Sequence, residues 1–216
     1  MLKTLLPRRR FAALALCAAA WLSAGPSFAL TDADGAAART VVEELARDLG
    51  DLAERTAGMS RADAVDASAS LLTSSFDLDR IAAATVGRTR YESWTPEQRA
   101  TYVEAFTRYT LATQTGSLTR YEQDRLTIGE AVDGPAGLVM VRTQYQEGDG
   151  GTSTVDFMLH KDGSGAFRIV DLVVDGSVSQ LQLRRAEFSS VLQSKGYDGL
   201  IEVLNETTQK ILAKSG

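Results

Sequence analysis

Apolar side chains recur every three to four positions after residue 34, which is the spacing of one helix face. This pattern predicts a helix over residues 34–55 whose apolar stripe is Val41, Val42, Leu45, Leu49 and Leu52. An alanine-rich second helix is predicted over residues 61–74. Asp77 is a candidate cap for a short third helix that ends near Gly87.

The clearest helix start in the sequence is Thr95-Pro96-Glu97-Gln98. Thr95 is a good N-cap, Pro96 fits the first helical position, and Gln98 completes a capping box. Aromatic residues then follow at spacings of four and three and form one stripe of Tyr102, Phe106 and Tyr109. The sequence therefore predicts a helix with an aromatic face.

The hydrophobic pattern changes to alternation near residue 125, which is typical of strands with one buried face. Four strands are predicted over residues 125–132, 138–146, 154–161 and 167–174. Their connections are short and rich in Gly and Asp, as in antiparallel hairpins. Two closing helices are predicted, one over residues 178–195 that stops at Gly196 and one from Asp198. The order of helices, strands and helices indicates one α+β domain with an antiparallel meander of four to five strands.

The apolar faces of the predicted strands could all point to one side of the sheet. The residues concerned are Val139, Val141, Tyr145, Val155, Phe157, Leu159, Phe167, Ile169 and Val173. The aromatic stripe of the helix after Thr95 could cover this face. Periodicity is the same for a filled core and for a cavity wall, so both interpretations stay open.

Residues 1–29 have the features of a cleavable secretory signal peptide. Basic residues Lys3 and Arg8 to Arg10 precede an apolar run over residues 11–22, and Ser27-Phe28-Ala29 places small residues at the −3 and −1 positions. The run is shorter than the about 20 apolar residues that span a membrane. Cys17 follows Leu16, where a lipoprotein signal has a small residue. We therefore expect one domain over residues 30–216 that acts outside the cytoplasm without an anchor.

Composition limits the chemistry of residues 30–216. Four of the 23 Lys and Arg residues lie in the predicted signal peptide, which leaves 19 against 28 Asp and Glu and a net charge of −9. This negative net charge argues against binding to nucleic acid and against binding to anionic lipid surfaces. The segment has no cysteine, which excludes a disulfide scaffold and a Cys/His nucleophile.

Metal and cofactor sites are not expected. The single histidine, His160, is out of phase with Val155, Phe157 and Leu159 and is therefore expected on the solvated face of its strand. One histidine cannot form a zinc site. The segment at 148–151 lacks the ending of a phosphate-binding loop and is interpreted as a hairpin turn.

Carboxylate catalysis is the enzymatic alternative. Asp156 and Asp171 lie within predicted strands, and either could act as a general base on a hydrophobic small molecule. A hydrogen-bonded structural aspartate is the favoured interpretation of both.

The last predicted strand carries the first of several family motifs. The segment Phe167-Arg168-Ile169-Val170-Asp171-Leu172-Val173-Val174-Asp175-Gly176 resembles the strand W-K-I-x-D-V-x-x-x-G of the MlaC / toluene-tolerance family of periplasmic lipid-binding proteins, with Phe167 in place of Trp. Ser177-Val178-Ser179 and Arg184-Arg185-Ala186-Glu187-Phe188 resemble the segment that follows it. Upstream, the similarity continues through Phe76-Asp77, Ile81, Gly87, Trp94, Gln98-Arg99 and Val155-Asp156-Phe157.

The resemblance implies an NTF2-like sheet with helices that enclose a hydrophobic pocket. It also implies a soluble, monomeric shuttle that carries phospholipid, with two acyl chains buried, and maintains outer-membrane lipid asymmetry. The implied partners are an outer-membrane lipoprotein complex and an inner-membrane ABC transporter with an MCE-domain subunit. The extra residue in Gly176-Ser177-Val178-Ser179 resembles a subgroup that includes hopanoid-associated proteins, so a hopanoid is an alternative cargo.

Together the resemblance and the apolar faces predict a lipid pocket without catalytic or metal-binding residues. The predicted pocket residues are Tyr102, Phe106, Tyr109, Val139, Val141, Tyr145, Val155, Phe157, Leu159, Ile169 and Val173. The rivals are an NTF2-like enzyme and a structural adaptor with a filled core that binds envelope proteins through its helices.

Overall fold

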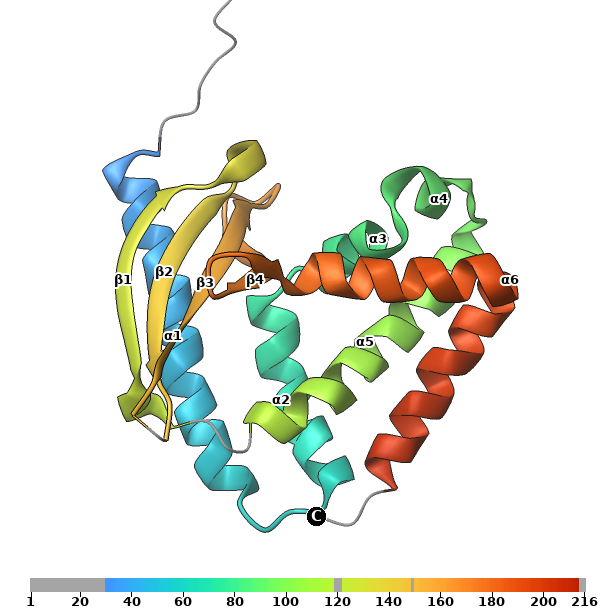
Figure 1. Cartoon of the computed structure of the whole chain (residues 1–216), viewed down its shortest axis with the longest axis horizontal. Helices are drawn as coiled ribbons and strands as arrows, with labels where there is room; N and C mark the ends of the chain where they lie inside the picture. Colours follow the sequence, from blue (N-terminus) through green and yellow to red (C-terminus); the bar gives the residue numbers. More distant parts are fainter. Residues whose placement is uncertain (1–29, 119–121, 149, 214–216) are drawn as a thin grey trace, which may run out of the picture.

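The computed structural model describes residues 30–118, 122–148 and 150–213, so the predicted signal peptide lies outside the described residues. The elements in chain order are α1 (Asp32–Thr56), α2 (Arg61–Ser75), α3 (Leu78–Val86), α4 (Arg88–Ser93), α5 (Pro96–Leu118), η1 (Gln123–Arg125), β1 (Leu126–Asp133), η2 (Pro135–Gly137), β2 (Val139–Gln146), β3 (Thr152–Lys161), β4 (Phe167–Val174), β5 (Val178–Ser179) and α6 (Gln180–Leu212). Figure 1 shows the curved sheet with α1 along it and the other long helices beside it.

The sheet is an open antiparallel meander in the order β1-β2-β3-β4-β5. This confirms the predicted α+β class and the antiparallel pairing. The sequence did not predict β5, whose Val178 and Ser179 pair with Val174 and Val173. The chain reverses between β4 and β5 because Asp175 and Gly176 both adopt positive φ, at 50° and 65°.

Local capping explains where α3 and α5 begin. The Asp77 carboxylate accepts the backbone N–H of Arg80 at 3.0 Å, as predicted for an N-cap. At α5, the N–H of Thr95 donates to Oε1 of Gln98 at 3.0 Å, and the N–H of Gln98 donates to Oγ1 of Thr95 at 3.2 Å. This reciprocal pair is the predicted capping box. The short helix α4 was not predicted.

The helix that covers the apolar sheet face is α1. Its stripe packs against the inner strand residues and forms one core cluster of Ala38, Val42, Leu45, Leu49, Leu52, Val139, Val141, Phe157, Leu159, Phe167 and Ile169. The expected cover by the aromatic stripe of α5 is therefore wrong. The stripe instead joins α3 and α6 in a second cluster, in which the buried Tyr102 hydroxyl hydrogen-bonds to Thr85 at 2.7 Å.

The long helix α6 bends sharply at Gly196 (Figure 1). Gly196 has φ 67° and ψ −166°, which is a region that essentially only glycine occupies. The bend confirms the predicted break between two closing helices. It also brings the second part of α6, with the fully buried Leu200 and Leu204, into the cluster with α5.

Gly196→Ala is expected to lower the free energy of unfolding by about 1–3 kcal/mol, because the strained backbone conformation would persist. A Cβ at this position would meet no atom within 4 Å, so the effect is conformational rather than steric. Gly163→Ala is the matched control, since it also meets no atom and has no positive φ. Denaturant unfolding measures both variants, and equal stability of the two would contradict this account of the bend.

Candidate functional site

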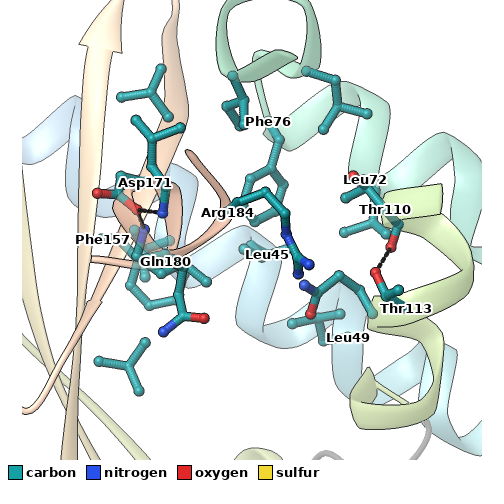
Figure 2. Close-up of a pocket in the computed structure, with 18 of the residues that line it drawn as sticks. Leu45, Leu49, Leu72, Phe76, Thr110, Thr113, Phe157, Asp171, Gln180 and Arg184 are labelled. Atoms are coloured by element: carbon teal, nitrogen blue, oxygen red, sulfur yellow. Dashed lines mark hydrogen bonds between the residues drawn. The ribbon is translucent and has the colours of Figure 1, made fainter. Parts of the chain in front are cut away.

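A cavity of about 350 Å³ lies between the α1–sheet layer and the helices α2, α3, α5 and α6. Figure 2 shows Phe157 of β3 on one side of it, Thr110 and Thr113 of α5 on the other, and Leu45 and Leu49 of α1 between them. Its apolar wall consists of Val42, Leu45, Ala46, Leu49, Leu72, Phe76, Leu78, Ile81, Phe106, Leu126, Tyr145, Val155, Phe157, Val170, Leu172 and Leu181. The polar wall residues are Thr85, Thr110, Thr113, Gln114, Asp171, Gln180 and Arg184.

The cavity exists because the two core clusters border it without closing over it. Phe157 of β3 belongs to the α1–sheet cluster, and Phe106 of α5 belongs to the helical cluster, yet both side chains line the cavity. The volume lies within the range of about 300–1,000 Å³ that is typical of ligand pockets. A largely apolar wall of this size can hold an apolar ligand.

Four of the eleven predicted pocket residues line this cavity, namely Phe106, Tyr145, Val155 and Phe157. Val139, Val141, Leu159 and Ile169 pack beneath α1 in the sheet cluster. Tyr102 and Tyr109 pack against α6 in the helical cluster. Val173 is partly buried and is not among the wall residues.

The predicted pocket did not include the contribution of α1. Val42, Leu45 and Leu49 stand at helical spacing in the sequence, but this spacing is the same for a helix that fills a core and for one that lines a cavity. The wall residues of α2 and α3, such as Leu72 and Ile81, were also missed. Their place follows from how the helices pack, which the pattern within each helix does not contain.

One basic side chain, Arg184 of α6, stands in the cavity wall. Its Nη1 donates to the hydroxyl of Tyr109 and to Oε2 of Glu187 at 2.8 Å. Its guanidinium lies over the Tyr109 ring, 5.0 Å from the ring centroid. Burial raises the pKa of the Tyr109 phenol, so this hydroxyl stays protonated and accepts the hydrogen bond. Figure 2 shows Arg184 between Asp171 on the sheet side and Thr110 and Thr113 on α5.

Asp171, a candidate general base, lines the cavity but is engaged in hydrogen bonds. Its carboxylate accepts the N–H of Leu172 at 2.8 Å, the N–H of Leu181 at 2.8 Å and the hydroxyl of Ser179 at 2.5 Å. Two of these donors stand at the start of α6, so Asp171 anchors that helix to β4. The geometry fits the structural interpretation. The other candidate, Asp156, is not a wall residue.

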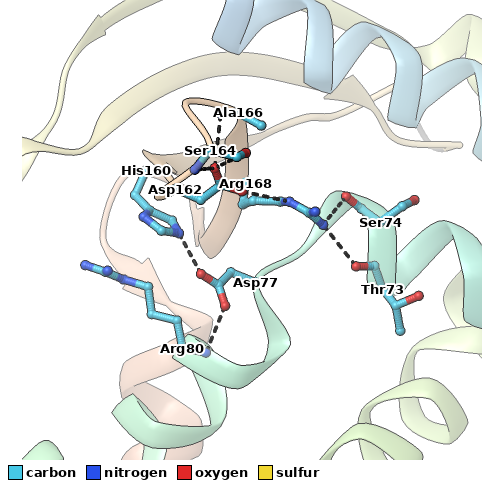
Figure 3. A network of polar contacts seen from close by, with 9 residues as sticks. All are labelled: Thr73, Ser74, Asp77, Arg80, His160, Asp162, Ser164, Ala166 and Arg168. Carbon is cyan, nitrogen blue, oxygen red and sulfur yellow. Dashed lines mark hydrogen bonds and ion pairs between the residues drawn. The ribbon is translucent and has the colours of Figure 1, made fainter.

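The predicted surface position of His160 is wrong. Its side chain is only 13% exposed, and its Nε2 lies 2.7 Å from Oδ2 of Asp77. The segment between α2 and α3 covers this part of the sheet, because the N–H of Asp77 donates to the carbonyl of Ile169 at 3.0 Å. Arg168 adds hydrogen bonds to the carbonyls of Thr73 and Ser74 at the end of α2. Figure 3 shows this network, which ties β3 and β4 to the helices.

The length and polarity of the helices and the placement of possible metal ligands bear on other functions. No helix within residues 30–118, 122–148 and 150–213 is both long and apolar enough to cross a membrane. No group of three or more His, Cys, Asp or Glu side chains in the described part of the chain is arranged to hold a metal ion.

The fold and the cavity define an α+β protein that can enclose an apolar ligand. The family described as "MlaC protein" matches residues 39–206, so the chain belongs to the MlaC family. Its members are periplasmic binding or transport proteins. No curated protein matches the chain.

A solved structure with a similar fold is the phospholipid-binding protein from Ralstonia solanacearum in complex with a phospholipid. The TM-score is 0.66 at 21% sequence identity, and the match covers 83% of this chain and 98% of that one. The similarity confirms the expected fold, which is consistent with the NTF2-like class.

Proposed function

We propose that this protein is a periplasmic carrier of phospholipid. The observation that carries the proposal is the largely apolar cavity of about 350 Å³, in a chain of the MlaC family. The acyl chains lie against the apolar wall, between α1 and the sheet on one side and α5 on the other. The head group stays at the polar side, where the exposed residues Gln114 and Gln180 border the cavity.

A carrier of this kind answers a physical need. Exposure of acyl chain to water costs about 0.8 kcal/mol per CH₂ group. Two chains contain about 30 such groups, so uncatalysed transfer through water faces a barrier on the order of 20 kcal/mol. An apolar cavity lowers this barrier in proportion to the length of acyl chain that it shields from water during transfer.

The carrier takes lipid between an outer-membrane lipoprotein complex and an inner-membrane ABC transporter with an MCE-domain subunit, and so maintains outer-membrane lipid asymmetry. The sequence pattern that predicts a signal peptide over residues 1–29 supports a periplasmic site of action. We propose that the carrier works as a monomer and buries both acyl chains of one phospholipid.

Purified protein from cells with intact envelope membranes is expected to hold about one phospholipid per chain, because the apolar wall is stabilised by a ligand that covers it. Extraction with organic solvent and mass spectrometry of the extract measures both the lipid class and the stoichiometry. A hopanoid in place of phospholipid would support the alternative cargo. Absence of any stoichiometric lipid would contradict the carrier and favour an adaptor or an enzyme.

A further inference from the structure

The position of Arg184 in the cavity wall sets it apart from the other basic residues. It follows Gln180 by four residues on α6, so both side chains stand on the helix face that borders the cavity. The side chain is 29% exposed, which places it where the cavity meets solvent. No other Lys or Arg is among the wall residues that the structure describes.

The guanidinium of Arg184 is held in place while part of its donor capacity remains open. The rings of Tyr109 and Phe188 lie 5.0 and 5.9 Å from its central carbon, and Nη1 makes both of its polar contacts. Among the residues that the structure describes, Nε and Nη2 have no hydrogen-bond partner. A planar guanidinium with two free donating nitrogens matches the two oxygens of a phosphodiester.

The charges around Arg184 permit an anion to bind. Glu187, its ion-pair partner, is 57% exposed, so this carboxylate can turn into solvent when a phosphate arrives. Asp171 is the other charged wall residue, and its carboxylate already accepts the hydroxyl of Ser179 and the N–H groups of Leu172 and Leu181. These donors offset its repulsion of a second anion.

We propose that Arg184 binds the phosphodiester of the lipid head group at the mouth of the cavity and thereby selects glycerophospholipids over phosphate-free lipids such as hopanoids. This inference rests on the proposed carrier function and extends it to the class of cargo. The apolar wall holds the tails of either class, whereas the charge-assisted hydrogen bonds of Arg184 form with a phosphodiester and not with a neutral lipid.

The test is a competition between two lipids with the same acyl chains. Delipidated protein is incubated with equimolar, detergent-dispersed phosphatidylglycerol and diacylglycerol, and mass spectrometry measures the ratio of the bound lipids. Wild-type protein is expected to favour phosphatidylglycerol about tenfold, and Arg184→Gln is expected to lower this ratio to about one through loss of the charged hydrogen bonds. Arg185→Gln is the matched control, because this neighbouring side chain lies in a different surface groove with Gly87 and Ser189.

Arg184→Lys keeps the charge but loses the planar fork, so it is expected to lower the ratio to about threefold. If circular dichroism shows that Arg184→Gln does not fold, the bound-lipid ratio of Arg184→Lys is used as the test instead. A wild-type ratio in a folded Arg184 variant would overturn the assignment of the phosphate site while leaving the carrier function intact. Wild-type protein that takes up neither lipid would overturn the carrier function itself.

A third arm distinguishes a lipid head group from a free phosphodiester. Glycerophosphoglycerol, which has the same head group without tails, is added in tenfold excess over phosphatidylglycerol. We expect the bound lipid to remain unchanged, because the soluble compound gains nothing from the apolar wall. Displacement of most of the lipid would overturn the lipid assignment and indicate a site for free phosphodiesters.

Discussion

Val155→Glu is expected to leave the folded protein almost free of lipid. Val155 is a partly buried residue of β3 that lines the cavity. A carboxylate there would stand among apolar side chains and acyl chains, where burial of an unpaired charge costs several kcal/mol. An ionised glutamate retains its water and prevents the tails from covering the wall. A loss of more than tenfold in bound lipid is expected, measured as phospholipid per chain after purification.

Val178→Glu is the matched control for this prediction. Val178 is 40% exposed in β5 and is not a wall residue, so the same change there should leave the lipid content unaltered. Circular dichroism spectra establish that both variants fold. Wild-type lipid content in folded Val155→Glu would show that the tails do not contact this wall, and equal loss in both variants would point to a general effect of charge.

The choice of Val155 shows what the alternating pattern in the strands can predict. Val141 and Val155 have the same phase toward the inner face, and the sequence assigned both to one pocket. In the structure Val141 is fully buried beneath α1, so a charge there would unfold the protein rather than test the cavity. Alternation identifies the face of a strand that is buried, but the helix that covers each part of it is set by packing between distant segments.

Helix boundaries were predictable because their determinants are local. The capping interactions at Asp77 and Thr95 join residues three positions apart, and the bend at Gly196 depends on the conformation of one residue. Such contacts involve only residues that are close in the sequence, so the local sequence is enough to predict them. This is why the starts of α3 and α5 and the break within α6 could be predicted from the sequence, although α4 was not.

The polar contacts that the sequence did not reveal join residues far apart in the chain. His160 bonds to Asp77 across 83 positions, and Arg184 bonds to Tyr109 across 75. The phase of a residue in its strand or helix predicts which face its side chain lies on. It does not predict which distant residue will contact that face. For this reason a histidine expected in solvent is partly buried, and an arginine known only from a family motif stands in the cavity wall.

Phe188→Ala is expected to lower the free energy of unfolding of the delipidated protein by about 3–5 kcal/mol, which is the usual cost of removing a buried aromatic ring. Phe188 is 2% exposed and contacts Phe106 and Tyr109 with ring centroids 6.2 and 6.0 Å apart. These rings join the first part of α6 to α5, and a small domain has only about 5–15 kcal/mol of stability in total. Denaturant unfolding measures the loss, and delipidated protein is used because bound ligand adds stability of its own.

The same variant tests which aromatic residues are structural. Phe188 lies outside the cavity wall, so the Phe188→Ala protein that remains folded should still hold about one lipid per chain. Phe188→Leu retains most of the side-chain volume and should be destabilised by less than about 1.5 kcal/mol, which makes it the control for packing. A lipid loss in folded Phe188→Ala would instead place this ring, and the adjoining Tyr109 of the predicted pocket, in contact with the tails. If stability falls and lipid content does not change, the aromatic cluster between α5 and α6 serves to hold the helices around the cavity.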